Sequence, residues 1–190
     1  MWWPGETPFE IAIGAILTQN TNWANVQKAI NNLKKEGLLN PEELVKISTD
    51  KLSLLIKPSG YYNIKAKRIR AFLDFLMTNY QGNMEALKAH EMDILREQLL
   101  AIHGIGPETA DSILLYAIEK PVFVIDSYTK RVLSRHGILE HNSSYAEYQS
   151  LFHKELKKDV ELFNEFHALF VKIGKDYCKT SPLCSGCPLA

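Results

Sequence analysis

The sequence has little that would mark a secreted, membrane-bound or broadly basic protein. Its 22 Lys and Arg residues balance 22 Asp and Glu residues, so a globally basic surface is excluded and any nucleic-acid binding must rest on a local patch. No apolar run approaches the ~20 residues that span a bilayer. The start, MWWPGETPFE, lacks the basic and apolar regions of a signal peptide. We therefore expect a cytoplasmic protein, nucleoid-associated in a prokaryote, with no membrane partner.

Cysteine is also scarce. The three cysteines, Cys178, Cys184 and Cys187, lie together near the end of the chain. An odd, clustered set in a chain without an export signal favours metal ligation over a disulfide framework.

Strand signals are missing as well. No alternating Val/Ile/Thr segment and no internal repeat occurs, whereas Trp23, Val26, Ile30 and Leu33 repeat at helical spacing, as do most other segments. The sequence predicts an all-α protein with about ten helices.

Residues 99–110, LLAIHGIGPETA, are expected to form a helix, a tight turn and a second helix. Gly104 and Gly106 permit positive φ and the close approach of another backbone, and Ile105 would bury the turn in the core. The unpaired N–H groups and dipole at the second helix favour an anion such as a phosphate. A bare GxG is more simply a glycine C-cap, but the whole pattern matches the helix-hairpin-helix DNA-binding motif. It predicts DNA contacts at Gly104, Ile105, Gly106 and Thr109.

Asp126 follows the hairpin, where the apolar residues 122–125 meet a predicted helix. Alone, it would be an N-cap worth about 1 kcal/mol. With the hairpin, LTQNT at 17–21, SGYYNIKA at 59–66 and the terminal cysteines, the sequence resembles the helix-hairpin-helix/Gly-Pro-Asp superfamily of DNA glycosylases, which includes endonuclease III. The resemblance runs from roughly Phe9 to Cys187. It implies that Asp126 is the catalytic residue.

A carboxylate suits the chemistry of this superfamily. Cleavage of an N-glycosidic bond passes through an oxocarbenium-like sugar, whose charge a fixed carboxylate stabilises while it orients a water. The target nucleotide must first be flipped out of the duplex. Gln19 matches a superfamily residue that fills the resulting gap, although a buried amide satisfied by a helix end is the plainer alternative. We expect the partner to be double-stranded DNA with damaged bases, bound by a monomer.

Glu108 stands at a position that separates two classes of the superfamily. Members that also cut the DNA strand resemble this segment but carry a lysine there, whose amine forms a Schiff base with the sugar. Glutamate cannot form an imine, so the resemblance implies a glycosylase without AP lyase activity. Glu108 is expected to be a solvated first-turn acid that suits the helix dipole. Lys130 could substitute, but an ion pair with Asp126 or a phosphate contact is the simpler expectation.

The three tryptophans all lie in the N-terminal part of the chain. Alkylated purines carry positive charge, and indole faces attract cations by ~0.5–2 kcal/mol, although any one tryptophan could simply be core. WWP, LTQNT and PSGYYNIKAKR together resemble the 3-methyladenine DNA glycosylases of the endonuclease III-like branch. That resemblance implies a base pocket lined by Trp2, Trp3, Pro4 and Trp23.

A basic segment without acids runs from Lys57 to Arg70. A charge run is usually a solvated face, but such a segment could also hold backbone phosphates. The superfamily loop here touches DNA near the lesion, and we expect Lys65 and Lys67 to make phosphate contacts.

The cysteine spacing, Cys178-x5-Cys184-x2-Cys187, resembles the terminal 4Fe–4S loop of endonuclease III, which has four thiolates. The first spacing is one residue shorter than usual and a fourth cysteine is missing, which suggests a shortened chain. Three thiolates could hold an incomplete cluster, or zinc with a fourth ligand from elsewhere. A structural iron–sulfur cluster is the favoured prediction.

Together these features predict a two-lobed helical fold. Residues 8–119 would form a helical bundle that ends in the hairpin, and residues 1–7 with 120–190 a second lobe with the cysteine loop. The active site would lie in the cleft between them, near Asp126 and Gln19. The predicted function is monofunctional excision of alkylated purines. The alternatives are a glycosylase for oxidised or mismatched bases and a non-catalytic helix-hairpin-helix module that only holds DNA.

Overall fold

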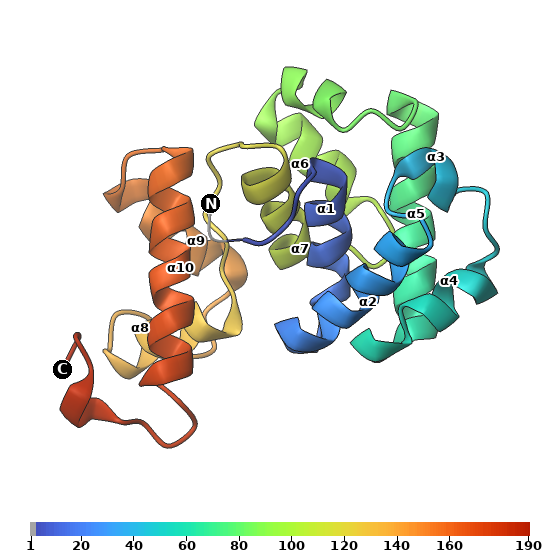
Figure 1. Cartoon of the computed structure of the whole chain (residues 1–190). Coiled ribbons are helices and arrows are strands. Elements are labelled where there is room, and N and C mark those ends of the chain that lie inside the picture. The colour runs from blue at the N-terminus through green and yellow to red at the C-terminus, as the bar shows by residue number, and fades with distance from the viewer. Residues whose placement is uncertain (1–2) are drawn as a thin grey trace. The chain divides into compact units, whose positions relative to one another are not determined.

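The computed structural model describes residues 3–190, so Trp2, predicted for the base pocket, lies outside the described residues. The described chain is helical and contains no strand. The prediction of an all-helical fold is confirmed. The described residues divide into two compact units, Trp3–Lys120 and Pro121–Ala190, whose helices are labelled in Figure 1. Each unit is described by itself.

The Trp3–Lys120 unit contains seven α-helices, two 3₁₀ turns and one π-helical turn. The helices are α1 Pro8–Leu17, α2 Trp23–Lys35, α3 Pro41–Leu44, α4 Thr49–Leu55, α5 Tyr62–Tyr80, α6 Met92–Leu100 and α7 Pro107–Ser112. Short 3₁₀ turns occupy Lys57–Ser59 and Glu85–Ala89, and a π-helical turn, Ile113–Ala117, continues directly from α7.

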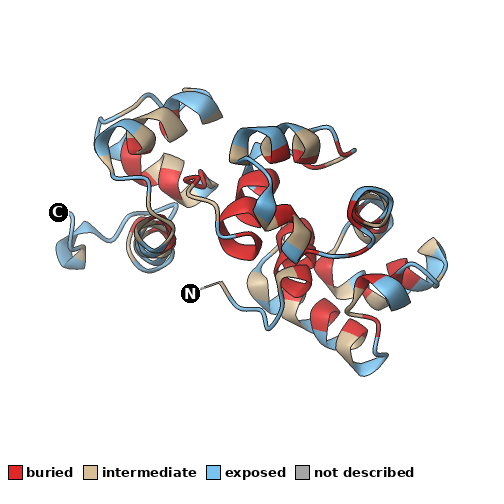
Figure 2. Cartoon of the chain, turned by 90° about the horizontal axis from the view of Figure 1, so that it is seen from above, coloured by how far each residue is buried: buried red, intermediate tan, exposed pale blue. Residues whose placement is uncertain are grey.

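Helix α1 is the centre of this unit. Thr7 caps it by accepting a hydrogen bond from the Glu10 N–H at 3.1 Å, and Pro8 takes the first helical position, where its missing N–H costs nothing. Every residue from Phe9 to Leu17 is buried. A helix that is apolar on all sides belongs in a core, and Figure 2 shows the buried residues gathered inside the helices of the unit.

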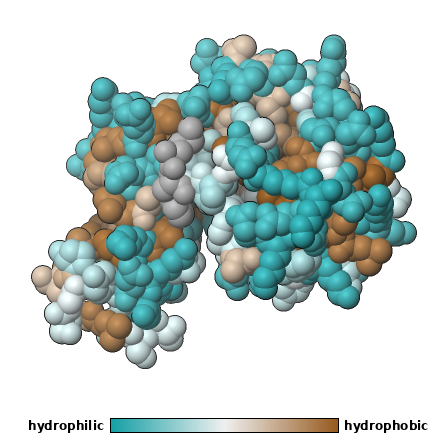
Figure 3. Space-filling view, viewed as in Figure 1, coloured by the Kyte–Doolittle hydropathy of each residue, from teal (hydrophilic) through white to brown (hydrophobic). Residues whose placement is uncertain are grey.

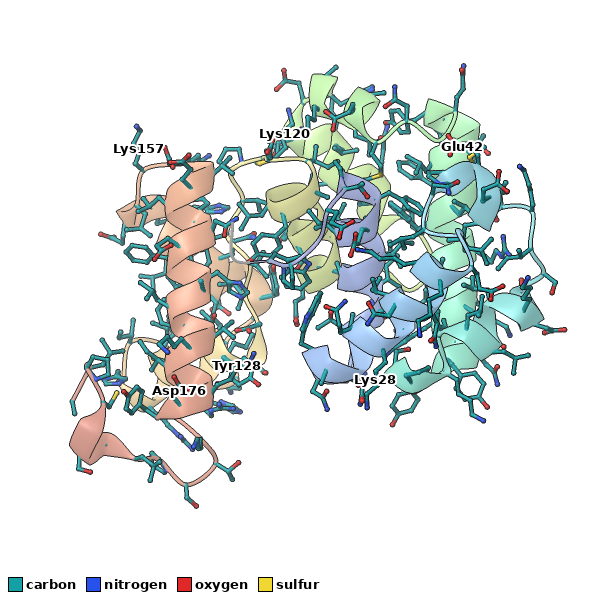
Figure 4. The ribbon with its side chains drawn as sticks, viewed as in Figure 1. Lys28, Glu42, Lys120, Tyr128, Lys157 and Asp176 are labelled. Atoms are coloured by element: carbon teal, nitrogen blue, oxygen red, sulfur yellow. The ribbon has the colours of Figure 1, made fainter. Side chains whose placement is uncertain are left out.

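The Pro121–Ala190 unit is built on three helices, α8 Ser127–Arg135, α9 Tyr145–Glu155 and α10 Val160–Asp176, followed by a 3₁₀ turn at Cys184–Gly186. Gly174 lets α10 contact α8 closely, because a Cβ atom at this position would lie 2.7 Å from the Cβ of Tyr128. Figure 4 shows Tyr128 and Asp176 at the same end of this helix pair. Arg131 ties the pair together by donating from Nη2 to the Gly174 carbonyl at 2.8 Å.

The visible surface of the Trp3–Lys120 unit is mainly hydrophilic, with smaller apolar areas between (Figure 3). Its exposed large hydrophobic residues include Leu54, Tyr61 and Ile64, which are 67%, 68% and 51% exposed. Within the described residues, no helix is long and apolar enough to cross a bilayer.

Candidate active site

The glycine turn between α6 and α7 has the predicted architecture, but only one of its two glycines adopts positive φ. Gly104 adopts φ +83°, and Ile105 is 4% exposed, so its predicted burial in the core is confirmed. Gly106 has φ −93°, so it does not use the positive φ that glycine permits. A Cβ atom at Gly106 would meet nothing within 4 Å. The surface at Gly106 is therefore open enough for the close approach of another backbone.

A buried ion pair joins the two helices of the hairpin. Arg96 on α6 donates from Nε to Asp111 Oδ1 at 2.6 Å and from Nη2 to Oδ2 at 3.1 Å. The Asp111 side chain is fully buried and that of Arg96 is 26% exposed. Bidentate guanidinium–carboxylate pairs fix geometry as well as energy. The pair thus sets the angle at which α7 leaves the turn.

Gln19 holds the LTQNT loop against this hairpin. Its Nε2 donates to the Gly104 carbonyl at 3.1 Å and to Thr109 Oγ1 at 2.9 Å. Its Oε1 accepts a hydrogen bond from Arg68, whose aliphatic stem lies where a Cβ atom of Gly104 would be, 2.7 Å from Arg68 Cδ. The Gln19 amide is therefore satisfied at both ends, and Thr109 turns its hydroxyl inward. Gap filling by Gln19 and DNA contact by Thr109 stay predictions.

Lys65 does not face solvent, which corrects the expected phosphate contact. The side chain is buried, and Nζ donates to the Leu17 carbonyl at 2.8 Å and the Ser59 carbonyl at 2.6 Å. It thereby pairs with a carbonyl of the last turn of α1, where a positive charge is favourable. Burial and the nearby Arg68 charge lower the pKa of Lys65 to about 8. Lys67 is exposed, and its phosphate contact stays a prediction.

The lowered pKa of Lys65 predicts a pH-dependent stability. Between about pH 8 and 10.5 the unfolded chain binds a proton at this position and the folded chain does not, so the free energy of unfolding rises with pH. The rise is of the order of 3 kcal/mol over the whole interval. Urea denaturation at pH 8 and pH 10 should show it in the wild type and not in Lys65→Met. An equal pH response in both proteins would contradict the assignment.

Asp126 caps α8 as the sequence suggested. Its Oδ1 accepts a hydrogen bond from the Thr129 N–H at 2.7 Å, and its Oδ2 lies 3.5 Å from Nε2 of His167 on α10. Burial raises the pKa of the Asp126 carboxyl, but the His167 and Thr129 contacts outweigh it, so the pKa falls below its usual value of 3.8. The carboxylate is therefore ionised at neutral pH although its side chain is only 13% exposed.

Position 108 carries a carboxylate and no amine. Glu108 is exposed in the first turn of α7, as expected of a solvated acid. Lys130 does not pair with Asp126, which corrects one expectation. Its Nζ lies 5.2 Å from the centre of the Tyr148 ring and 3.5 Å from the Ser143 carbonyl.

An aromatic cluster forms around the start of α1. The Trp3 ring stacks on Tyr116 with centroids 4.8 Å apart and meets Trp23 edge-on at 5.4 Å. Gly14 lies against both indoles, since a Cβ atom there would be in van der Waals contact with Trp23 at 3.5 Å and with Trp3 at 3.7 Å. Pro4 is exposed. Sequence reasoning missed Tyr116, which lies in the π-helical turn 113–117, a feature common at functional sites.

The three cysteines do not form a metal site in this structure. Cys178 is buried and its Sγ accepts a hydrogen bond from Arg135 at 3.4 Å, whereas Cys184 is exposed. Nowhere in residues 3–190 do three Cys, His, Asp or Glu side chains converge on a point that could hold a metal ion. These residues do not fit the four-thiolate set of a 4Fe–4S cluster. The cluster stays a prediction, which absorbance near 400 nm would test.

Residues 13–158 match the HhH-GPD superfamily of base excision DNA repair proteins. The chain belongs to this superfamily. The resemblance inferred from the sequence is thereby confirmed, with Asp126 and the hairpin both inside the matching region.

Two relatives within the HhH-GPD superfamily match almost the whole chain. A Methanocaldococcus jannaschii protein, named as a candidate DNA repair glycosylase, is 49% identical over 99% of this chain and 86% of its own length. Endonuclease III of Thermotoga maritima is 32% identical over 95% of this chain and 79% of its own length.

Solved structures of DNA glycosylases are also similar to this chain in fold. The H. pylori 3-methyladenine DNA glycosylase bound to 1,N6-ethenoadenine superposes with a TM-score of 0.81 and 33% identity, covering 92% of this chain and 87% of that one. An endonuclease III–DNA complex superposes with a TM-score of 0.84 and 26% identity, covering 98% and 83%.

Proposed function

We propose that this chain is a monofunctional DNA glycosylase that excises alkylated purines from double-stranded DNA as a monomer. The observation that carries the proposal is Asp126, a mostly buried but ionised carboxylate at the start of α8. A helix-hairpin-helix module that only held DNA would need a cap at the start of α8, which asparagine or serine supplies equally well, but would not need a negative charge there. The catalytic role of Asp126 is taken from the resemblance to the superfamily and agrees with its local environment.

The chemistry follows from the fixed negative charge. As the N-glycosidic bond breaks, the sugar gains oxocarbenium character, and a carboxylate held in place stabilises it without reorganising. Oδ1 is committed to the Thr129 N–H, which leaves Oδ2 to face the sugar and orient a water as general base. In the predicted arrangement, this water would attack the sugar of a nucleotide flipped out of the duplex.

The aromatic cluster supports alkylated purines as the substrate class. Trp3, Trp23 and Tyr116 lie in one unit, where Trp3 and Trp23 are half-buried and Tyr116 is buried beneath Trp3. A purine alkylated at N3 or N7 is cationic and is attracted to an indole face more than its neutral parent. The H. pylori structure, named as a 3-methyladenine DNA glycosylase, is a relative with this substrate.

Release of free bases tests the substrate class. We expect the purified protein to liberate 3-methyladenine-type bases from genomic DNA treated with a methylating agent, as measured by chromatography of the supernatant. A duplex carrying an oxidised pyrimidine or a mismatch serves as the control and should lose no base. Release from the control alone would instead support the endonuclease III-like alternative, and release from neither would contradict glycosylase activity.

The lyase assignment makes a separate prediction. Borohydride reduction during turnover should trap no protein–DNA adduct in the wild type, because an imine needs an amine and Glu108 has none. Glu108→Lys is the matched variant, since position 108 is exposed in the first turn of α7 and accepts a lysine without a clash in the core. A gel-shifted adduct with the wild-type protein would contradict the monofunctional assignment.

A further inference from the structure

His167 is buried beside the reactive group although no part of the sequence motif includes it. It lies on α10, is 2% exposed, and places Nε2 3.5 Å from Asp126 Oδ2. The edge of its ring meets Phe123 at a centroid distance of 6.4 Å, with the rings perpendicular. Packing thus fixes the imidazole, so that it cannot follow the carboxylate if the carboxylate moves.

The two carboxylate oxygens of Asp126 have different neighbours. Oδ1 is held by the Thr129 N–H of the helix that Asp126 caps, whereas Oδ2 faces the imidazole from another helix. Rotation about the Cβ–Cγ bond moves both oxygens together, and the cap restrains it through a single hydrogen bond at Oδ1. A second contact from α10 removes the remaining freedom. This carboxylate is thus contacted by the Thr129 N–H at Oδ1 and by the His167 imidazole at Oδ2.

We propose that His167 is a positioning residue for base excision, holding Oδ2 of Asp126 at the place where the sugar cation forms. This inference rests on the proposed function, because it assigns to His167 a role that acts through Asp126. Displacement of a reacting group by about 1 Å lowers the reaction rate roughly a hundredfold. The contact therefore matters for the rate of the chemical step and not for the affinity for DNA.

Two amide variants separate the contact from simple packing. A glutamine amide nitrogen reaches about as far from the backbone as Nε2 of histidine, whereas an asparagine amide stops near the position of Nδ1. We expect His167→Asn to slow single-turnover release of methylated purines roughly ten- to a hundredfold with an unchanged duplex Kd, and His167→Gln to restore most of the rate. Wild-type rates in both variants, or equal losses in both, would overturn the proposal.

A matched control comes from another histidine of the same unit. His153 accepts a hydrogen bond from the Phe123 N–H at 3.0 Å and stacks on Phe163, so its role is structural. His153→Asn should lower the melting temperature without slowing the single-turnover rate. If it slows the rate as much as His167→Asn does, general loosening of the core explains both and the proposal falls.

A carboxyl titration by ¹³C NMR gives a readout that needs no activity. The Asp126 carboxyl should titrate below its ordinary range in the wild type and clearly higher in His167→Asn. An unmoved titration would overturn the proposal. Should the wild type release no base from methylated DNA, the proposed function fails by that result, whereas the titration still reports separately whether His167 controls the carboxylate.

Discussion

Asp126→Asn is expected to reduce base release from methylated DNA by roughly a factor of 10²–10³ or more, to the level of a negligible activity, while the duplex Kd stays within about twofold. Asparagine is as good an N-cap as aspartate, so the hydrogen bond to the Thr129 N–H survives and α8 keeps its start. The substitution therefore removes the charge and little else. Single-turnover release and fluorescence anisotropy measure the two quantities.

The same substitution at a second helix cap provides the control. Asp159 caps α10 by accepting from the Leu162 N–H at 3.0 Å, as Asp126 caps α8. Asp159→Asn should leave the rate of base release unchanged. A wild-type rate in Asp126→Asn would contradict the mechanism, and a comparable loss in both variants would trace the effect to helix capping.

The lowered pKa of Asp126 adds an expectation about pH. The carboxylate stays ionised down to below pH 3.8, so its contribution to folding is present above that value and is lost as the pH falls through the folded-state pKa. Any loss of activity between pH 5 and 7 must then come from another group, such as the DNA or a second side chain.

The second large effect is expected from Asp111→Asn, which keeps the volume of the side chain but removes its charge. Breaking a buried ion pair from one side leaves the other charge uncompensated. Because Arg96 is 26% exposed and can recover some hydration, we expect a loss of about 3 kcal/mol, at the lower end of the usual range. Urea denaturation followed by circular dichroism measures it.

An exposed pair of the same kind is the control for Asp111. Lys172 and Asp176 lie 3.0 Å apart on α10, with side chains 70% and 48% exposed. Asp176→Asn should change stability by no more than about 0.5 kcal/mol. Similar losses in the two variants would show that burial of the hairpin pair is not what makes it stabilising.

Much of the fold and of the candidate site could be predicted from local sequence patterns. The hairpin, the buried Ile105 and the capping role of Asp126 depend on residues within a few positions of one another, where turn chemistry and helix periodicity decide the structure. The all-helical fold followed from the same periodicity. The catalytic role of Asp126 came from a resemblance and stays a proposal.

Contacts between distant segments could not be read from the sequence. Lys65 sits in a basic run typical of a solvated face, yet its ammonium group binds the Leu17 carbonyl 48 positions away. His167 reaches Asp126 from another helix. Tyr116, near the end of the Trp3–Lys120 unit in sequence, stacks on Trp3 at its beginning. A single sequence gives the type of each side chain but not its long-range neighbour, and burial by that neighbour decides its role.

The amine of Lys65, which pairs with a carbonyl at the end of α1, can also report on the opening of the structure around it. When the helices around Lys65 open, its amine loses the burial that lowers its pKa and reacts with an acylating reagent like any exposed lysine. Its burial keeps the reagent away as long as the helices around it stay together. The rate of acylation at Lys65, measured by mass spectrometry, would therefore report how often the core of the Trp3–Lys120 unit opens.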